Sequence, residues 1–133
     1  VALAHARGFE VRPLVGPSSL LLALMASGAN GQSFAFKGYL PSEKDGRIQA
    51  LKALEQHSRK HGETQIFIET PYRNDALLAD AVGQLHPATQ LCVACDLTLP
   101  TQTIISKAVA DWRKLKEMPN LKKRPAIFVL YAA

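Results

Sequence analysis

The stretch that most constrains the fold is Pro13 to Ser19 (PLVGPSS), which precedes an apolar run from Leu20 to Met25. A β-type run over 9–15 ends at Gly-Pro, and a helical pattern follows at once. Pro17 favours the first turn of a helix because its fixed φ is helical and its missing N–H would have no partner there. The sequence therefore predicts a strand-to-helix corner that gathers free backbone N–H groups and the hydroxyls of Ser18 and Ser19.

A second corner of the same kind follows residues 65–69 (QIFIE), where Thr70-Pro71 begins the next helix. In open α/β sheets, ligands bind at the carboxyl ends of strands. Two such corners on neighbouring strands would converge on one cleft, near Glu69, Tyr72 and Arg73. The structural alternative is a tight turn before a buried helix at the first corner, and a capped helix start with a surface ion pair at the second.

Short apolar runs alternate with helix-type spacing along the rest of the chain. Period-two or continuous apolar runs suit strands, and apolar residues three and four apart suit amphipathic helices. Ser42 with Asp45 resembles a capping box at one helix start. The predicted strands cover 33–40, 65–69, 91–95, 103–105 and 126–131, and the predicted helices cover 17–27, 42–60, 71–85 and 108–118.

Strands that alternate with helices indicate an α/β fold. The strands are almost continuously apolar, so we expect a layered sheet with helices on both faces. The helix over 17–27 is apolar nearly all round and is expected to be buried on more than one side. With 133 residues, 47% of them hydrophobic, and no visible repeat or linker, the chain suits a single domain over 1–133.

The chain opens at Val1, without a Met, inside a helical pattern that Gly8 closes. We interpret residues 1–8 as the tail of a truncated helix and the chain as a piece of a longer protein. No apolar run approaches the roughly 20 residues of a membrane span, and no signal-peptide pattern occurs, so a cytoplasmic location is expected. The net charge of +5 is compatible with a polyanionic partner without requiring one.

Two residue pairs have spacings that can mark metal or redox sites. Cys92 and Cys95 form a C-x-x-C pair, but residues three apart in a strand point to opposite faces, and no second pair exists for zinc. Buried structural thiols are the favoured interpretation. His57 and His61 share one helix face, yet they lie among basic residues at a helix end, which favours a solvated cationic terminus.

Basic residues straddle the last predicted helix and the turn after it: Arg113, Lys114, Lys116, Lys122, Lys123 and Arg124. Such a group can hold phosphates, although a solvated face is more common. The aromatic residues that accompany cations in single-strand binders are missing from this group, because Trp112 belongs to the core stripe. One hypothesis is therefore a non-catalytic α/β binding or dimerisation module that uses this basic face.

Four motifs occur in order: VGPSS at 15–19, FIETPYR at 67–73, DLTLP at 96–100 and PAIFVL at 125–130. Together they resemble the C-terminal domain of the tetrapyrrole (corrin/porphyrin) methylase family. Within that family they are most similar to the branch of ribosomal RNA small-subunit methyltransferase I. The resemblance covers essentially the whole chain and implies the C-terminal half of a two-domain, homodimeric methyltransferase that uses S-adenosylmethionine.

The resemblance also implies roles for individual residues. Glu69 would be a candidate base, and Arg73 a candidate ligand for a substrate phosphate. The motifs imply no metal ligand. The residues that would contact S-adenosylmethionine are Ser18, Ser19, Ile68, Glu69, Leu97, Pro125 and Ala126.

The implied reaction methylates a ribose 2′-hydroxyl of ribosomal RNA, and a tetrapyrrole precursor is the alternative acceptor. Displacement at a sulfonium needs chiefly alignment and exclusion of water, together with a group that accepts the hydroxyl proton.

The chain departs from the branch's usual pattern at two points. Cys95-Asp96 stands where Arg-Glu is usual, which removes a cation, and Tyr72 stands where His is usual. Because the other wall of the cleft would lie in an N-terminal domain, we expect this chain alone to bind the cofactor poorly.

Overall fold

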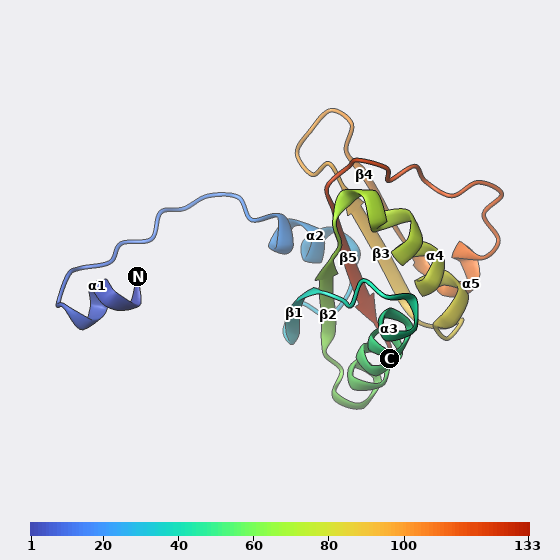
Figure 1. The fold of residues 1–133 in the computed structure, drawn as a ribbon, viewed down its shortest axis with the longest axis horizontal. Helices are drawn as coiled ribbons and strands as arrows, with labels where there is room; N and C mark the ends of the chain where they lie inside the picture. The colour runs from blue at the N-terminus through green and yellow to red at the C-terminus, as the bar shows by residue number, and fades with distance from the viewer.

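The computed structural model describes residues 1–133, most of which surround one five-stranded sheet with the strand order β1-β2-β5-β3-β4 (Figure 1). β1 and β2 run parallel, and every other neighbouring pair is antiparallel. The α/β class predicted from the sequence is confirmed. The strands are β1 (Phe34–Tyr39), β2 (Thr64–Ile68), β3 (Gln90–Cys95), β4 (Thr103–Ala108) and β5 (Ala126–Tyr131).

Helices cover both faces of the sheet, as expected. On one face, α2 (Ser19–Ser27) packs Ala23 and Leu24 against alternate residues of the central strands. The larger core lies on the other face, under α3 (Lys44–His61), α4 (Asn74–Gln84) and α5 (Val109–Trp112). There the rings of Phe67 and Phe128 stack with centroids 5.6 Å apart. The sequence predicted most of this core because β3 and β5 are apolar at nearly every position and β2 ends in the apolar run Ile66 to Ile68.

The predicted strand over 9–15 is wrong. No strand forms there, and Leu14 and Val15 are fully exposed. With the short helix α1 (Ala2–Ala6), which buries no residue, this segment extends away from the sheet (Figure 1). The apolar run has no neighbouring strand to supply ladder hydrogen bonds, so its β-propensity does not produce a strand.

The helix predicted over 17–27 begins two residues later, at Ser19, and is buried on one side only. Met25 remains 78% exposed on its outer side. The capping box at Ser42 and Asp45 does not form, because α3 starts after Glu43 without a side-chain cap. The carbonyl of Ser42 instead accepts a hydrogen bond from Arg47.

The last predicted helix, over 108–118, is much shorter than expected, and α5 ends at Trp112. Two side chains tie the chain to other elements at that point. The indole of Trp112 donates to the carbonyl of Leu91 at 2.8 Å, and the guanidinium of Arg113 donates to the carbonyls of Val82 and Leu85 at the end of α4. These bonds attach the end of α5 to β3 and to the end of α4. The chain then continues without regular secondary structure to β5.

The cysteine pair behaves as a pair of structural thiols. Cys92 packs under α2 and Cys95 packs in the larger core, on opposite faces of β3, and both are free. Burial raises the pKa of Cys92 to about 11 and also raises the pKa of Cys95.

We therefore expect neither thiol to react with a thiol reagent such as DTNB at pH 8 in the folded protein, because the thiolate is the nucleophile and is scarcely populated. Both thiols should react at once in denaturant. Absorbance of the released chromophore measures the rate, and rapid labelling of a folded sample would contradict the prediction.

No helix of the structure combines the length and the apolar character that crossing a membrane requires.

Candidate functional site

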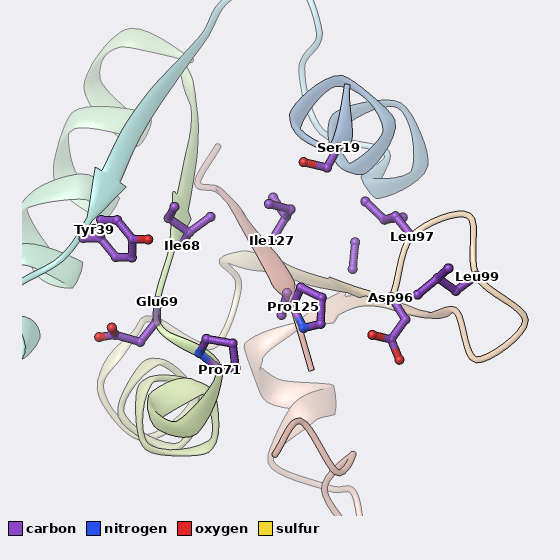
Figure 2. A pocket seen from close by; sticks show the side chains of 12 residues that line it. Ser19, Tyr39, Ile68, Glu69, Pro71, Asp96, Leu97, Leu99, Pro125 and Ile127 are labelled. Atoms are coloured by element: carbon purple, nitrogen blue, oxygen red, sulfur yellow. The ribbon is translucent and has the colours of Figure 1, made fainter. Parts of the chain in front are cut away.

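A pocket of about 370 Å³ opens at the sheet edge where β1, β2 and β3 end and β5 begins (Figure 2). This volume is typical of small-molecule pockets, which span roughly 300–1,000 Å³. Its lining is mainly apolar and contains two carboxylates but no basic side chain. The lining residues are Ser19, Tyr39, Ile68, Glu69, Pro71, Ala94, Asp96, Leu97, Leu99, Pro125, Ala126 and Ile127.

The floor of the pocket is one row of the sheet. Tyr39 of β1 pairs with Ile68 of β2, Ile68 pairs with Ile127 of β5, and Ile127 pairs with Ala94 of β3. Because paired residues in neighbouring strands share a face, this row presents an apolar platform on the α2 side. The platform suits a flat, uncharged part of a ligand.

Ser19 lines the pocket from above, at the first residue of α2 (Figure 2). The first turn of an α-helix leaves backbone N–H groups without intrahelical partners, and these groups favour an anion. Ser18 is the N-cap residue and lies outside the pocket lining. The first corner therefore contributes to the pocket through the start of the helix, although no strand precedes it.

Glu69 is one of the two buried carboxylates of this pocket, with a side chain that is 1% exposed. Its Oε1 accepts the backbone N–H of Thr70 at 2.7 Å and lies 3.6 Å from Nη1 of Arg73. Its Oε2 is buried without any hydrogen-bond partner. Because an unpartnered buried carboxylate oxygen is costly, Oε2 is a strong candidate to accept a hydrogen bond from a ligand.

Arg124 joins the two loops that form the far wall of the pocket. Its guanidinium donates to Oδ2 of Asp96 at 2.8 Å and to the carbonyls of Thr101 and Asn120 at 2.7 Å each. Asp96 also accepts the Thr101 hydroxyl at 2.9 Å. The motif at Cys95-Asp96 lacks the cation that is usual in the resembled branch. In the structure, Arg124 supplies a cation beside Asp96.

The hydrogen bonds from Arg124 and Thr101 hold the pKa of Asp96 below its usual value. A carboxylate with a lowered folded-state pKa adds stability above its unfolded pKa, near 4, and loses that stability as the pH falls toward the folded value. We therefore expect wild type to have a higher melting temperature than an Asp96→Asn variant at pH 6, and the difference to shrink below about pH 4. Thermal melts of both proteins from pH 3 to pH 7 measure this, and a difference that grows as the pH falls would contradict it.

The structure brings together most residues that the sequence singled out: Ser19, Ile68, Glu69, Leu97, Pro125 and Ala126 all line the pocket. Ser18 and Arg73 do not line it, although Arg73 contacts Glu69. Sequence reasoning missed six lining residues: Tyr39, Pro71, Ala94, Asp96, Leu99 and Ile127. Tyr39 was detectable, because it ends the strand before the one that ends at Ile68, and parallel strands end at the same sheet edge.

The two histidines lie in the last part of α3, a helix that contributes no residue to the pocket lining. His57 and His61 have ring centroids 4.5 Å apart, and Nε2 of His57 lies 3.1 Å from Oε1 of Glu63. The structure contains no group of three or more His, Cys, Asp or Glu side chains placed to hold a metal ion.

The fold is shared with solved structures that include a methyltransferase. The methyltransferase CobJ matches 99% of this chain and 55% of its own chain, with a TM-score of 0.57 and 20% identity. A conserved hypothetical protein from Aeropyrum pernix K1 matches 98% of this chain and 51% of its own, with a TM-score of 0.59 and 15% identity. At these identities the likeness defines the fold class and nothing finer.

Curated sequence relatives are more specific than the fold. The chain is 33% identical over 126 residues to the Ribosomal RNA small subunit methyltransferase I of Escherichia coli O157:H7, and 34% identical over 132 residues to that of Pseudomonas aeruginosa. The matches cover 92% and 99% of this chain but 42% and 45% of those proteins. The chain thus spans less than half the length of these relatives. No family model matches the chain. The resemblance predicted from the four motifs is confirmed by these relatives.

Proposed function

We propose that this chain forms part of a methyltransferase that transfers a methyl group from S-adenosylmethionine to a ribose 2′-hydroxyl of ribosomal RNA. The observation that carries the proposal is the pocket itself. It gathers most of the residues that the methyltransferase motifs single out, and one of them is a buried carboxylate with a free oxygen. Such an enzyme works where ribosomes are assembled, so the proposed location is the cytoplasm.

The residues of the pocket suit the parts of this cofactor. The apolar platform of Ile68, Ile127 and Ala94 can pack against the flat adenine ring. Oε2 of Glu69 can accept a hydrogen bond from a ribose hydroxyl or an amino group. The N-terminus of α2 at Ser19 favours the cofactor's carboxylate. Leu97, Pro125 and Ala126 complete the wall, and Ser18 contributes as the N-cap of the same helix.

When bound, S-adenosylmethionine supplies an electrophilic methyl group on a sulfonium. The chain's own part is to align the acceptor, to exclude water with its apolar lining and to accept the hydroxyl proton. We assign the proton-accepting role to Glu69, whose side chain is shielded from solvent, and the binding of a substrate phosphate to Arg73, which is partly exposed beside it.

Titration calorimetry with S-adenosylhomocysteine tests the cofactor assignment. Glu69→Gln keeps the size of the side chain but replaces one oxygen by an N–H donor, so we expect affinity to fall about tenfold or more. Glu63→Gln, on a distant loop, is the matched control and should bind as wild type does. The measurement should be made on this chain and on a protein of the relatives' full length. Equal binding by wild type and Glu69→Gln in both would refute the role of Glu69, and no binding by either wild-type protein would refute the proposal.

Transfer of radiolabelled methyl groups identifies the acceptor. The full-length protein should label small ribosomal subunits, and digestion should place the label on a ribose. Label that appears only in a tetrapyrrole precursor would overturn the RNA assignment while leaving the cofactor assignment intact.

We also propose that the assembled enzyme is a homodimer, as the resemblance implies. Exposed apolar side chains on the α2 side support this. Met25 on α2 is 78% exposed, and Phe34 and Phe36 on the edge strand β1 are 42% and 47% exposed. Light scattering measures the mass, and replacing Phe34 and Phe36 by Ser should convert a dimer to a monomer.

A further inference from the structure

An exposed aromatic ring lies at the rim of the pocket. Tyr72 is 70% exposed and directly follows Pro71, which lines the pocket. The guanidinium of Arg73 lies 5.0 Å from the centre of this ring and donates to its hydroxyl at 3.2 Å. Arg73 is itself held near Glu69. One face of the ring is therefore braced by a fixed cation, and the side chain remains open to solvent.

A basic turn is bonded to the segment that follows this ring. Asn74, the first residue of α4, donates its side-chain N–H to the carbonyl of Arg124 at 2.7 Å. This bond joins the segment that carries Tyr72 to the turn that carries Lys122 and Lys123. Pro71 directly precedes Tyr72, and Pro125 directly follows the basic turn. Both prolines line the pocket and lie on the same side of it in Figure 2.

The basic turn is rigid. Leu121 is fully buried, and the guanidinium of Arg124 binds the carbonyls of Asn120 and Thr101. Lys123 has a left-handed backbone with φ of 59°, which fixes the direction of the turn. Neither lysine forms an ion pair, and both are exposed, so their charges are available to a ligand.

We propose that Tyr72, Arg73, Lys122 and Lys123 form a docking surface for a single-stranded RNA segment. One base stacks on the open face of Tyr72, and backbone phosphates contact the two lysines. Single strands are bound in this way, by aromatic stacking combined with cations along the backbone. The free cations lie outside the pocket, which suits a polyanion that crosses the rim. This inference deepens the proposed function and rests on it.

Fluorescence measurements on the 133-residue chain test the surface. The probe is a short single-stranded RNA that carries a fluorescein at one end and 2-aminopurine as an internal base. Anisotropy gives the dissociation constant over a range of salt concentrations, and quenching of 2-aminopurine reports stacking. Calorimetry with S-adenosylhomocysteine reports the cofactor site separately and is made on the same variants in a protein of the relatives' full length, because this chain alone is expected to bind the cofactor poorly.

We expect Tyr72→Ala to weaken RNA binding about tenfold and to abolish the quenching, whereas Tyr72→Phe keeps both. Lys122→Gln combined with Lys123→Asn, which tolerates the left-handed backbone, should lower the slope of log affinity against log salt by about 1.4, or about 0.7 for each lost phosphate contact. The matched control, Lys52→Gln with Lys60→Gln, removes the same charge from the exposed side of α3 and should leave the slope unchanged.

Three outcomes would overturn the proposal: equal losses in the α3 control, unchanged binding in the Tyr72→Ala and lysine variants, or binding of a porphyrin polycarboxylate that depends on these residues while RNA binding does not. Because the docking variants leave the cofactor pocket intact, they should retain the calorimetric signal of wild type. A wild-type protein of the relatives' full length that binds RNA through this surface but no cofactor would refute the proposed function and not the docking surface.

Discussion

Replacing Arg47 by methionine is expected to lower the free energy of unfolding by about 3 kcal/mol. Arg47 and Asp80 form a buried ion pair between α3 and α4, with Nε and Nη2 of the arginine 2.7 and 2.6 Å from Oδ2 of the aspartate. The substitution leaves the Asp80 carboxylate buried with only Lys44, 3.9 Å away, as a neighbouring cation. That remote cation places the expected cost at the lower end of the range for a broken buried pair.

The double substitution Arg47→Met with Asp80→Leu separates the cost of an unpaired charge from the contribution of the pair. Removing both charges should restore most of the lost stability, because two apolar side chains of similar size can fill the site. Urea unfolding followed by the fluorescence of Trp112 measures both variants. A single variant within 1 kcal/mol of wild type would show that Asp80 is solvated after the change.

Replacing Arg124 by methionine is expected to lower the affinity for S-adenosylhomocysteine about tenfold or more. The change removes the guanidinium that joins the Asp96 loop to the segment before β5, so both parts of the pocket wall lose their fixed positions. The carboxylate of Asp96 would keep only the Thr101 hydroxyl among its present side-chain donors. Calorimetry at neutral pH measures the affinity.

Arg113→Met is the matched control for this prediction. Arg113 also bridges two segments by hydrogen bonds to carbonyls, but those carbonyls belong to Val82 and Leu85, outside the pocket. Its loss should lower the melting temperature and leave cofactor affinity unchanged. Equal losses of affinity in both variants would show that general destabilisation, and not the wall of the pocket, explains the effect at Arg124.

The sequence predicted those elements whose signals are local. β3 and β5 are apolar at nearly every position, and α3 shows helical spacing and ends at Gly62, which adopts a left-handed backbone. The segment over 9–15 has the same local signal as a strand but finds no partner, and pairing cannot be inferred from propensity. α5 ends at Trp112, and the backbone after it forms only short turn bonds, from Lys114 to Asp111 and from Leu115 to Trp112, which the helical pattern over 108–118 does not indicate.

The pocket was predictable where motifs mark it and unpredictable where only tertiary structure does. Glu69 and Ser19 lie in motifs, and both line the pocket. The pairing of Asp96 with Arg124 joins residues 28 positions apart, and nothing in either local sequence indicates it. The link between the segment that carries Tyr72 and the basic turn is also invisible in the local sequence. It depends on the bond between Asn74 and Arg124.

The position of β5 has a consequence for how the protein is made. β5 separates β2 from β3, so these two earlier strands have no direct pairing with each other and meet only through the strand synthesised after them. During translation, therefore, β1-β2 and β3-β4 can exist only as two unconnected ribbons until residues 126–131 have left the ribosome. The apolar edges of β2 and β3 are unpaired during that interval, and such edges are prone to aggregation. Holding chaperones would protect this chain most in the interval before β5 is made.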